Sequence, residues 1–141
     1  MTVRVRRLSD VPLPRRQTEG SAGFDLCAAE DATIAAHGFS SVGTGLAVET
    51  PKGTEAQVRP RSGLAARHGI GVLNSPGTID SDYRGEIRVI LFNASDQDYR
   101  VRRGDRIAQL VFSLLADVEL VEADSLSETE RGPGGFGHTG A

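Results

Sequence analysis

Apolar and polar residues alternate in short segments along most of the chain. Alternation of this kind is typical of half-buried strands, because successive side chains of a strand point to opposite faces. The pattern predicts strands over residues 3–6, 21–29, 32–36, 39–49, 54–59, 70–73, 86–93, 99–102, 107–112 and 118–121. Gly43 and Gly45 interrupt the longest of these stretches and indicate a bulge or a bend. About ten short strands separated by turns predict an antiparallel β-sandwich or jelly roll.

One segment departs from the period of two. Residues 60–69 predict a short helix, with Ser62 as its N-cap and Gly69 as its C-terminal cap. Arg61, Ser62 and Gly63 stand at the start of this helix, where free backbone N–H groups and the positive end of the helix dipole favour an anion. A phosphate site is one interpretation, and an ordinary cap beside an exposed arginine is the simpler one.

The chain has 141 residues, which favours one domain. A net charge of −3 and a pI near 5.6 argue against general affinity for nucleic acid or anionic membranes. Cys27 is the one cysteine, so no intramolecular disulfide can form, and its apolar neighbours predict a buried, unreactive thiol. No apolar run approaches about 18 residues, and no hydrophobic region follows the charged N-terminus. We therefore expect a soluble protein in the cytoplasm.

The stretch 77–85 concentrates polar groups directly before an apolar strand. It holds Asp80, Asp82, Tyr83 and Arg84 between two glycines, and a turn containing a proline precedes it. One interpretation is a solvated hairpin in which the two aspartates make Asx turns. The other is a site whose carboxylates and aromatic ring contact a ligand.

Groups elsewhere in the chain support a ligand site. The three histidines are isolated in the sequence and the cysteine has no partner, so no metal-site spacing is present. Carboxylates, arginines and glycine-rich loops suit a polyphosphate with Mg²⁺, and aromatic rings suit a base or a sugar. The candidate residues are Asp25, Asp80, Asp82, Arg61, Arg131, Ser62, Gln109, Tyr83 and Phe136.

The chain ends in a segment rich in glycine. Residues 132–140 contain too much glycine to form a stable element alone, which predicts a disordered terminus. A segment that orders when it binds a ligand is the alternative, because a cation, an aromatic ring and hydrogen-bond donors occur in it. We expect a domain over residues 1–130 and a flexible arm over residues 131–141.

Five segments taken together resemble the five ordered motifs of the trimeric dUTPase family. They occur in the family's order and at similar spacing across residues 22–140. The segments are Ala22–Leu26, Pro60–Ala65, Gly77–Gly85, Arg103–Leu110 and Arg131–Gly140.

The resemblance implies a fold, a reaction and an assembly. The fold would be all-β, a distorted jelly roll of the dUTPase-like β-clip type with one short helix and a flexible arm. The reaction would be hydrolysis of dUTP to dUMP and pyrophosphate with Mg²⁺, which supplies dUMP for thymidylate synthesis and keeps uracil out of DNA. The assembly would be a homotrimer whose active sites are shared between subunits.

The resemblance also implies roles for residues near the hairpin. Asp80 would activate the water that attacks the α-phosphate, and Asn74 with the hairpin backbone would bind uracil. Tyr83 would pack under the deoxyribose and exclude a 2′-hydroxyl, and Asp25 would position the metal through water. The implied substrate-binding residues are Arg61, Ser62, Gly63, Asn74, Gly77, Thr78, Ile79, Asp80, Tyr83, Arg88, Gln109, Arg131, Phe136, Gly137, His138 and Thr139.

The arm would close over the site of a neighbouring subunit. Phe136 would stack on uracil, and Arg131 and Thr139 would contact the phosphates. His138 departs from the family pattern, which usually has Ser or Thr there, and its side chain cannot copy the compact donor geometry of a hydroxyl.

Two alternatives remain open. A dCTP deaminase shares the fold but has a catalytic glutamate in the strand after the third motif, where this chain has Ile90, and tends to have Ser in place of Gly63. A non-catalytic jelly-roll binding module predicts the loss of acids or arginines from the motifs, and none is lost.

Overall fold

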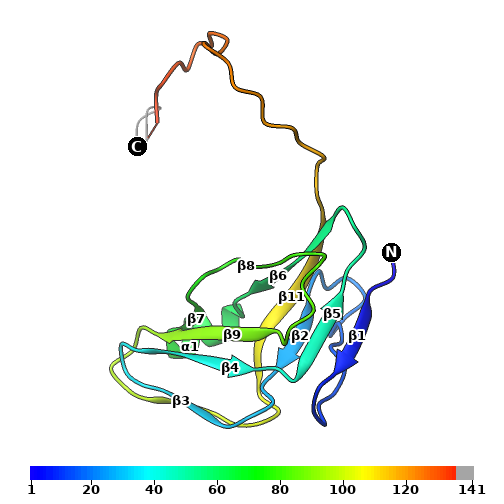
Figure 1. The fold of residues 1–141 in the computed structure, drawn as a ribbon. Helices are drawn as coiled ribbons and strands as arrows, with labels where there is room; N and C mark the ends of the chain where they lie inside the picture. The colour runs from blue at the N-terminus through cyan, green and yellow to red at the C-terminus, as the bar shows by residue number, and fades with distance from the viewer. Residues whose placement is uncertain (136–141) are drawn as a thin grey trace.

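The computed structural model describes residues 1–135, which contain eleven strands and one helix (Figure 1). Every strand predicted between residues 3 and 112 is present, with ends shifted by a few residues. The elements are β1 (Arg4–Arg7), β2 (Phe24–Cys27), β3 (Ala32–Ile34), β4 (Phe39–Gly43), β5 (Leu46–Glu49), β6 (Thr54–Arg59), α1 (Ser62–His68), β7 (Ile70–Val72), β8 (Gly77–Ile79), β9 (Arg88–Asn93), β10 (Tyr99–Val101) and β11 (Arg106–Leu114).

The strands pair antiparallel in four sheets. The largest sheet has the order β2-β11-β6-β8, and a second has the order β4-β9-β7. Two further pairs, β1-β5 and β10-β3, complete the fold. Most neighbours within a sheet are distant in sequence, as in a jelly roll, and the all-β prediction is confirmed.

One hydrophobic core lies between the two larger sheets. Leu26 and Leu110 from one sheet and Val89 and Leu91 from the other are almost fully buried and belong to a single cluster. The core is aliphatic, as the low content of aromatic residues requires. Burial of one such aliphatic side chain contributes about 1.5–3 kcal/mol, so this cluster fixes how the sheets face each other.

The bend predicted within residues 39–49 is confirmed. β4 ends at Gly43, and β5 starts after Gly45, which has a φ of 66°. A side chain rarely adopts this left-handed conformation, so glycine suits the position. The bend carries the chain from the β4-β9-β7 sheet to the β1-β5 pair.

Helix α1 begins differently from the prediction. Arg61, not Ser62, is the N-cap residue, with extended backbone angles and no capping hydrogen bond from its side chain. Ser62 is already the first helical residue, because the extended conformation ends with Arg61. Gly69 closes the helix in the left-handed conformation, as predicted, and its N–H donates to the carbonyl of Ala65.

The chain leaves the folded body after β11. Residues 115–135 run outward as an irregular segment (Figure 1). The strand predicted over residues 118–121 is therefore wrong: the segment has the alternating pattern of a strand but pairs with no other strand within residues 1–135. The proposed boundary after residue 130 stays a prediction.

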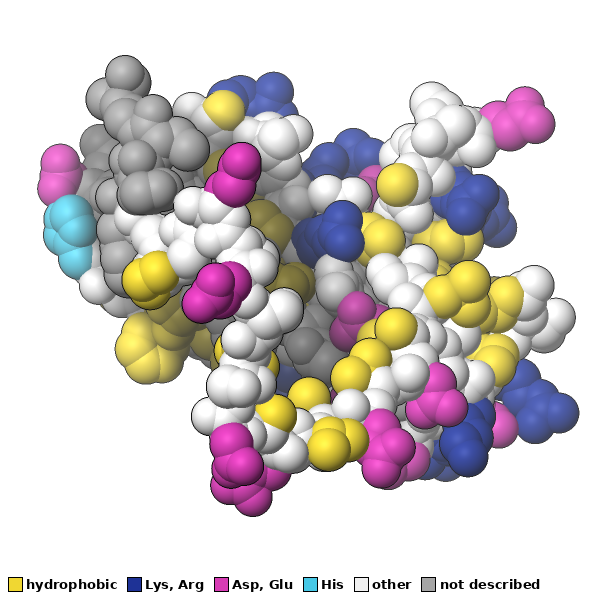
Figure 2. Space-filling model, turned by 90° about the horizontal axis from the view of Figure 1, so that it is seen from above, with side chains coloured by type: hydrophobic (Ala, Val, Ile, Leu, Met, Phe, Trp, Pro, Cys, Tyr) yellow, Lys and Arg dark blue, Asp and Glu magenta, His cyan; other side chains and the backbone are white. Residues whose placement is uncertain are grey.

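The outward segment leaves its apolar side chains largely exposed to solvent. Val118 is 68% exposed and Leu120 is 93% exposed. Figure 2, which views the molecule from above, shows hydrophobic side chains open to solvent among acidic ones. Within residues 1–135, no helix is long and apolar enough to cross a membrane.

Candidate active site

The hairpin that follows β7 forms one wall of a cavity of about 230 Å³. Most of the predicted residues of this region line the cavity, because the β8 edge and the first half of β9 face the same space, but Asp80 is not among them. The lining residues are Ser41, Val58, Val72, Asn74, Gly77, Thr78, Ile79, Tyr83, Glu86, Ile87, Arg88 and Ile90. We refer to this space as the hairpin pocket.

Asp80 directly follows Ile79, whose side chain lines the hairpin pocket, and is exposed to solvent. Its backbone carbonyl accepts a hydrogen bond from the Tyr83 N–H at 3.1 Å, which closes a tight turn. The Arg84 guanidinium donates to the carbonyls of Ser81 and Tyr83. Backbone and arginine contacts thus hold the turn and leave the Asp80 carboxylate at its surface.

The Asx turn proposed for Asp82 is wrong. Within residues 1–135 its side chain takes part in no hydrogen bond that would define such a turn. The Asp80–Tyr83 backbone bond performs that function instead.

Tyr83 forms the outer wall of the hairpin pocket. Its hydroxyl donates to the carbonyl of Glu86 at 2.9 Å, and its ring is partly exposed. Gly85 lies directly under the ring: a Cβ at this position would lie only 2.6 Å from the Tyr83 Cζ. The missing side chain at position 85 is what allows the ring to fold back against the hairpin.

Arg88 closes the far side of the hairpin pocket. Its guanidinium donates to Glu30 at 3.0 Å, to Glu86 at 3.1 Å, and to both the hydroxyl and the carbonyl of Ser41. Burial opposes its charge, but the bonds to Glu86 and Glu30 prevail and raise the pKa of Arg88. A backbone bond from Gly43 and the contact with Arg88 lower the pKa of Glu30. Sequence reasoning did not single out either glutamate.

A second group of polar side chains lies where β2, β11 and the start of α1 meet. Asp25 is its centre: one carboxylate oxygen lies 3.0 Å from Arg106 Nη1 and the other 3.7 Å from Arg61 Nε. The Arg61 guanidinium also donates to the Arg106 carbonyl at 2.8 Å. Two arginines around one largely buried carboxylate leave positive charge for an anion. We call this group, with Gln109, the arginine cluster.

Gln109 lies beside this group, opposite Asp25 in the pairing of β11 with β2. Its amide donates to the carbonyl of Pro60 at 3.0 Å. A Cβ at Gly23 would collide with the Gln109 side chain, so the glycine leaves the space that the amide occupies. Burial, followed by the neighbouring Asp25 charge, raises the pKa of the Cys27 thiol, as expected for an unreactive cysteine.

The other predicted residues fall in three places. Ser62 and Gly63 belong to the first turn of α1 beside Arg61, and this turn itself contains no acidic residue. Arg131 lies on the outward segment and donates to the carbonyl of Gly134. Phe136, Gly137, His138 and Thr139 lie outside the described residues.

Asp80 and the arginine cluster lie at different levels along β6. Ala56 pairs with Ile79, so Asp80 is level with Glu55 at the start of the strand. Arg61 follows the end of β6. Asp25 and Gln109 are level with Arg59, which is four residues or about 13 Å along β6 from the level of Asp80, and they lie on strands further across the sheet. One copy of the chain therefore does not bring Asp80 and the arginine cluster together.

The sequence matches known proteins over nearly its whole length. Residues 9–140 match the family model described as dUTPase. A deoxyuridine 5′-triphosphate nucleotidohydrolase of Wolinella succinogenes is 53% identical, covering 99% of this chain and 95% of that protein. One from Nautilia profundicola is 50% identical, covering 99% of each.

A solved structure also matches. The dUTPase of Staphylococcus bacteriophage 80alpha, a G164S mutant with dUpNHpp, superposes with a TM-score of 0.92, covers 99% of both chains and is 26% identical. Fold, motif order and sequence identity agree, and the chain belongs to the dUTPase family.

Proposed function

We propose that this protein hydrolyses dUTP to dUMP and pyrophosphate. The observation that carries the proposal is the hairpin pocket, in which Asn74, Thr78 and Tyr83 surround one cavity while the Asp80 carboxylate stands free beside it. The product dUMP would supply thymidylate synthesis, and the removal of dUTP from the nucleotide pool would keep uracil out of DNA. Because deoxynucleoside triphosphates are made and used inside cells, we also propose a cytoplasmic location.

The proposed chemistry is an in-line displacement at the α-phosphorus. Asp80 accepts a proton from water, and the water oxygen bonds to the α-phosphorus. The bond from that phosphorus to the bridging oxygen breaks, and pyrophosphate leaves. General-base help of this kind is worth about 10²–10⁴ in rate, or roughly 3–5 kcal/mol. Charge stabilisation must supply the larger share.

The hairpin pocket accounts for the nucleoside end of the substrate. Asn74 has an amide that can both donate to and accept from uracil, and the β8 backbone from Gly77 to Ile79 lies at the same wall. Tyr83 would lie under the deoxyribose, where its ring leaves no room for a 2′-hydroxyl. Arg88 completes the wall of this pocket.

The arginine cluster accounts for the triphosphate end. Arg61 and Gln109 supply directed donors, and Ser62 and Gly63 supply a hydroxyl and backbone N–H groups at the start of α1. Charge-assisted bonds from arginine to phosphate are among the strongest hydrogen bonds in proteins. Arg131, Phe136, Gly137, His138 and Thr139 are proposed to close over the site from the arm.

The donor set fits Mg²⁺ held mainly by the substrate. Both oxygens of Asp25 already face arginines, so this carboxylate suits a metal-bound water better than the ion itself. No group of three or more metal-ligating side chains exists in the part of the chain that the structure describes. When bound, Mg²⁺ neutralises triphosphate charge. Asp25 would orient its water shell.

We further propose that the protein is a homotrimer with shared sites. Because Asp80 and the arginine cluster are about 13 Å apart along β6 and lie on different strands of the sheet, each hairpin pocket would need the arginine cluster of a second copy. A third copy of the chain would supply residues 131–141.

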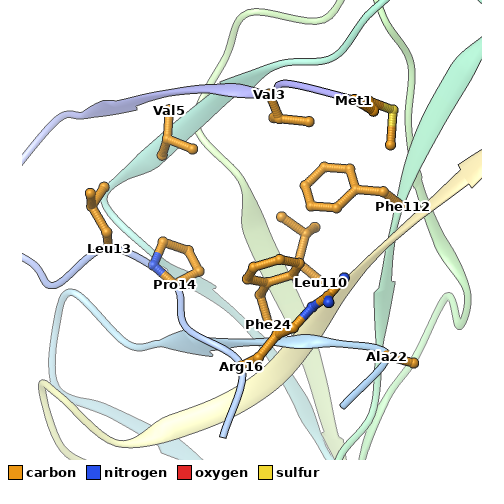
Figure 3. Close-up of a pocket in the computed structure, with 10 residues that line it drawn as sticks. All are labelled: Met1, Val3, Val5, Leu13, Pro14, Arg16, Ala22, Phe24, Leu110 and Phe112. Carbon is orange, nitrogen blue, oxygen red and sulfur yellow. The ribbon is translucent and has the colours of Figure 1, made fainter. Parts of the chain in front are cut away.

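An apolar groove supports this assembly. It has a volume of about 360 Å³ between β1 and β11, with the Phe24 and Phe112 rings meeting edge to face at 5.8 Å (Figure 3). The groove is lined by Met1, Val3, Val5, Leu13, Pro14, Arg16, Ala22, Phe24, Leu110 and Phe112.

The outward segment of another copy is the proposed occupant of this groove. Residues 115–124 present Val118 and Leu120 with four acidic residues and no basic one. Residues 1–16, which border the groove, carry five arginines and one aspartate. The outward segment thus matches the groove in apolar character, and its negative charge is opposite to the positive charge of residues 1–16.

A substrate assay tests the reaction. With Mg²⁺, the protein should release pyrophosphate from dUTP far faster than from dCTP, dTTP or UTP. The dCTP deaminase alternative needs a proton-transferring side chain where Ile90 lines the hairpin pocket. Ammonia released from dCTP would refute the proposal.

A variant tests the catalytic base. Asp80→Asn should lower kcat about 10²–10⁴-fold while the protein still binds dUpNHpp, since the amide cannot accept the proton. Asp82→Asn is the matched control in the same turn and should retain turnover. Near-normal kcat in Asp80→Asn would remove Asp80 as the base.

A further inference from the structure

The position of the Tyr83 ring depends on a polar network below the hairpin pocket. The ring rests on Gly85, and its hydroxyl is tied to the Glu86 carbonyl. Whatever fixes residue 86 therefore fixes the wall that faces the sugar. The side chain of Glu86 is tied on both sides: one oxygen accepts the Gly45 N–H at 2.9 Å and the other accepts Arg88 Nη1 at 3.1 Å.

Arg88 is in turn held by a residue distant in the sequence. Glu30, in the turn between β2 and β3, accepts Arg88 Nη2 at 3.0 Å and the Gly43 N–H at 2.8 Å with the same oxygen. Gly43 leaves the space in which these groups meet, because a Cβ there would lie 2.7 Å from Glu86 and 2.9 Å from Arg88. Three segments of the chain converge on one guanidinium.

Arg88 has few hydrogen atoms left for a ligand. Of the five N–H donors of a guanidinium, the contacts to Glu30, Glu86 and Ser41 use four. An isolated surface ion pair contributes little to stability, but a network with directed bonds from one arginine restrains geometry. The engaged guanidinium is better suited to holding a wall than to binding substrate.

We propose that Glu30 and Arg88 are positioning residues that hold the Tyr83 wall and thereby set the preference for a deoxyribose over a ribose. The inference rests on the proposed function and deepens it. Glu30 acts through Arg88, Arg88 orients Glu86, and Glu86 holds the Tyr83 hydroxyl. Loosening any link lets the ring move away and admits a 2′-hydroxyl.

The test measures kcat/KM for dUTP and for UTP in wild type, Glu30→Gln, Arg88→Lys and the double variant. Glu30→Gln should lower the dUTP/UTP ratio about tenfold, mainly through KM. Arg88→Lys keeps the charge but cannot reach all partners, so it should give a similar fall. The double variant should fall no further, because both residues act through one link.

Asp31→Asn is the matched control. It removes a charge from the same turn as Glu30 but away from Arg88, and its amide oxygen can still accept the bond from the Arg103 N–H. This variant should keep the wild-type ratio. A dUTP/UTP ratio that is unchanged in both Glu30→Gln and Arg88→Lys, or additive losses in the double variant, would refute this inference and leave the proposed function standing. Absence of dUTP hydrolysis by the wild-type protein would refute the proposed function instead.

Discussion

At the scale of single residues, glycines create the space in which the polar side chains of the site lie. Gly85 allows the Tyr83 ring to fold back on the hairpin, and Gly23 leaves room for the Gln109 amide. Neither glycine has a backbone conformation that requires its lack of a side chain, since neither has a positive φ. Their role is close approach, which composition alone does not reveal.

Gly23→Ala tests this role at the phosphate end. The added Cβ would displace the Gln109 amide from its bond to the Pro60 carbonyl. We expect a raised KM for dUTP and a stability loss of about 1–3 kcal/mol from overpacking, measured by steady-state kinetics and by urea unfolding. Gly20→Ala is the control, because nothing lies within 4 Å of that position. Equal behaviour of the two variants would contradict the role given to Gly23.

At the scale of elements, the alternating pattern predicted the strands that bury one face. β6 and β9 both have buried residues at every second position, and both were predicted within two residues. Prediction failed at residues 118–121, which alternate like a strand but have no partner strand within residues 1–135. The N-cap of α1 was wrong by one residue because Arg61 keeps an extended backbone.

The candidate site was predictable in its local parts only. The residues from Asn74 to Tyr83 form one continuous stretch of the sequence, so they were expected to lie around one pocket. The Glu30 contact with Arg88 spans 58 residues, and Arg106 meets Asp25 across 81 residues. Such partners depend on sheet topology, which the motif spacing does not contain.

The outward segment gives a prediction at this scale. Replacing both Val118 and Leu120 by aspartate adds charge where apolar side chains should enter the groove beside Phe24 and Phe112. The protein should dissociate into smaller species by light scattering and lose dUTP hydrolysis. Replacing Leu126, equally exposed but beyond the alternating stretch, should leave the assembly intact. A trimer that survives the double replacement would show that the groove has another occupant.

At the scale of the whole molecule, the central claim is that one copy supplies the hairpin with Asp80 and another supplies the arginine cluster with Arg61. Within a single chain, Asp80 and the arginine cluster lie at different levels of the sheet and on different strands. We propose that the jelly roll carries two half-sites on different parts of its surface and that the symmetry of the assembly completes them.

The most direct measurement is pyrophosphate release from dUTP by mixed assemblies of two inactive variants. Asp80→Asn lacks the base, and Arg61→Ala lacks the phosphate contact, so each homotrimer should be nearly inactive. When the two chains are co-expressed in equal amounts, about a quarter of the sites should combine an intact hairpin with an intact arginine cluster and recover activity. Activity no greater than the sum of the two separate variants would contradict the shared site.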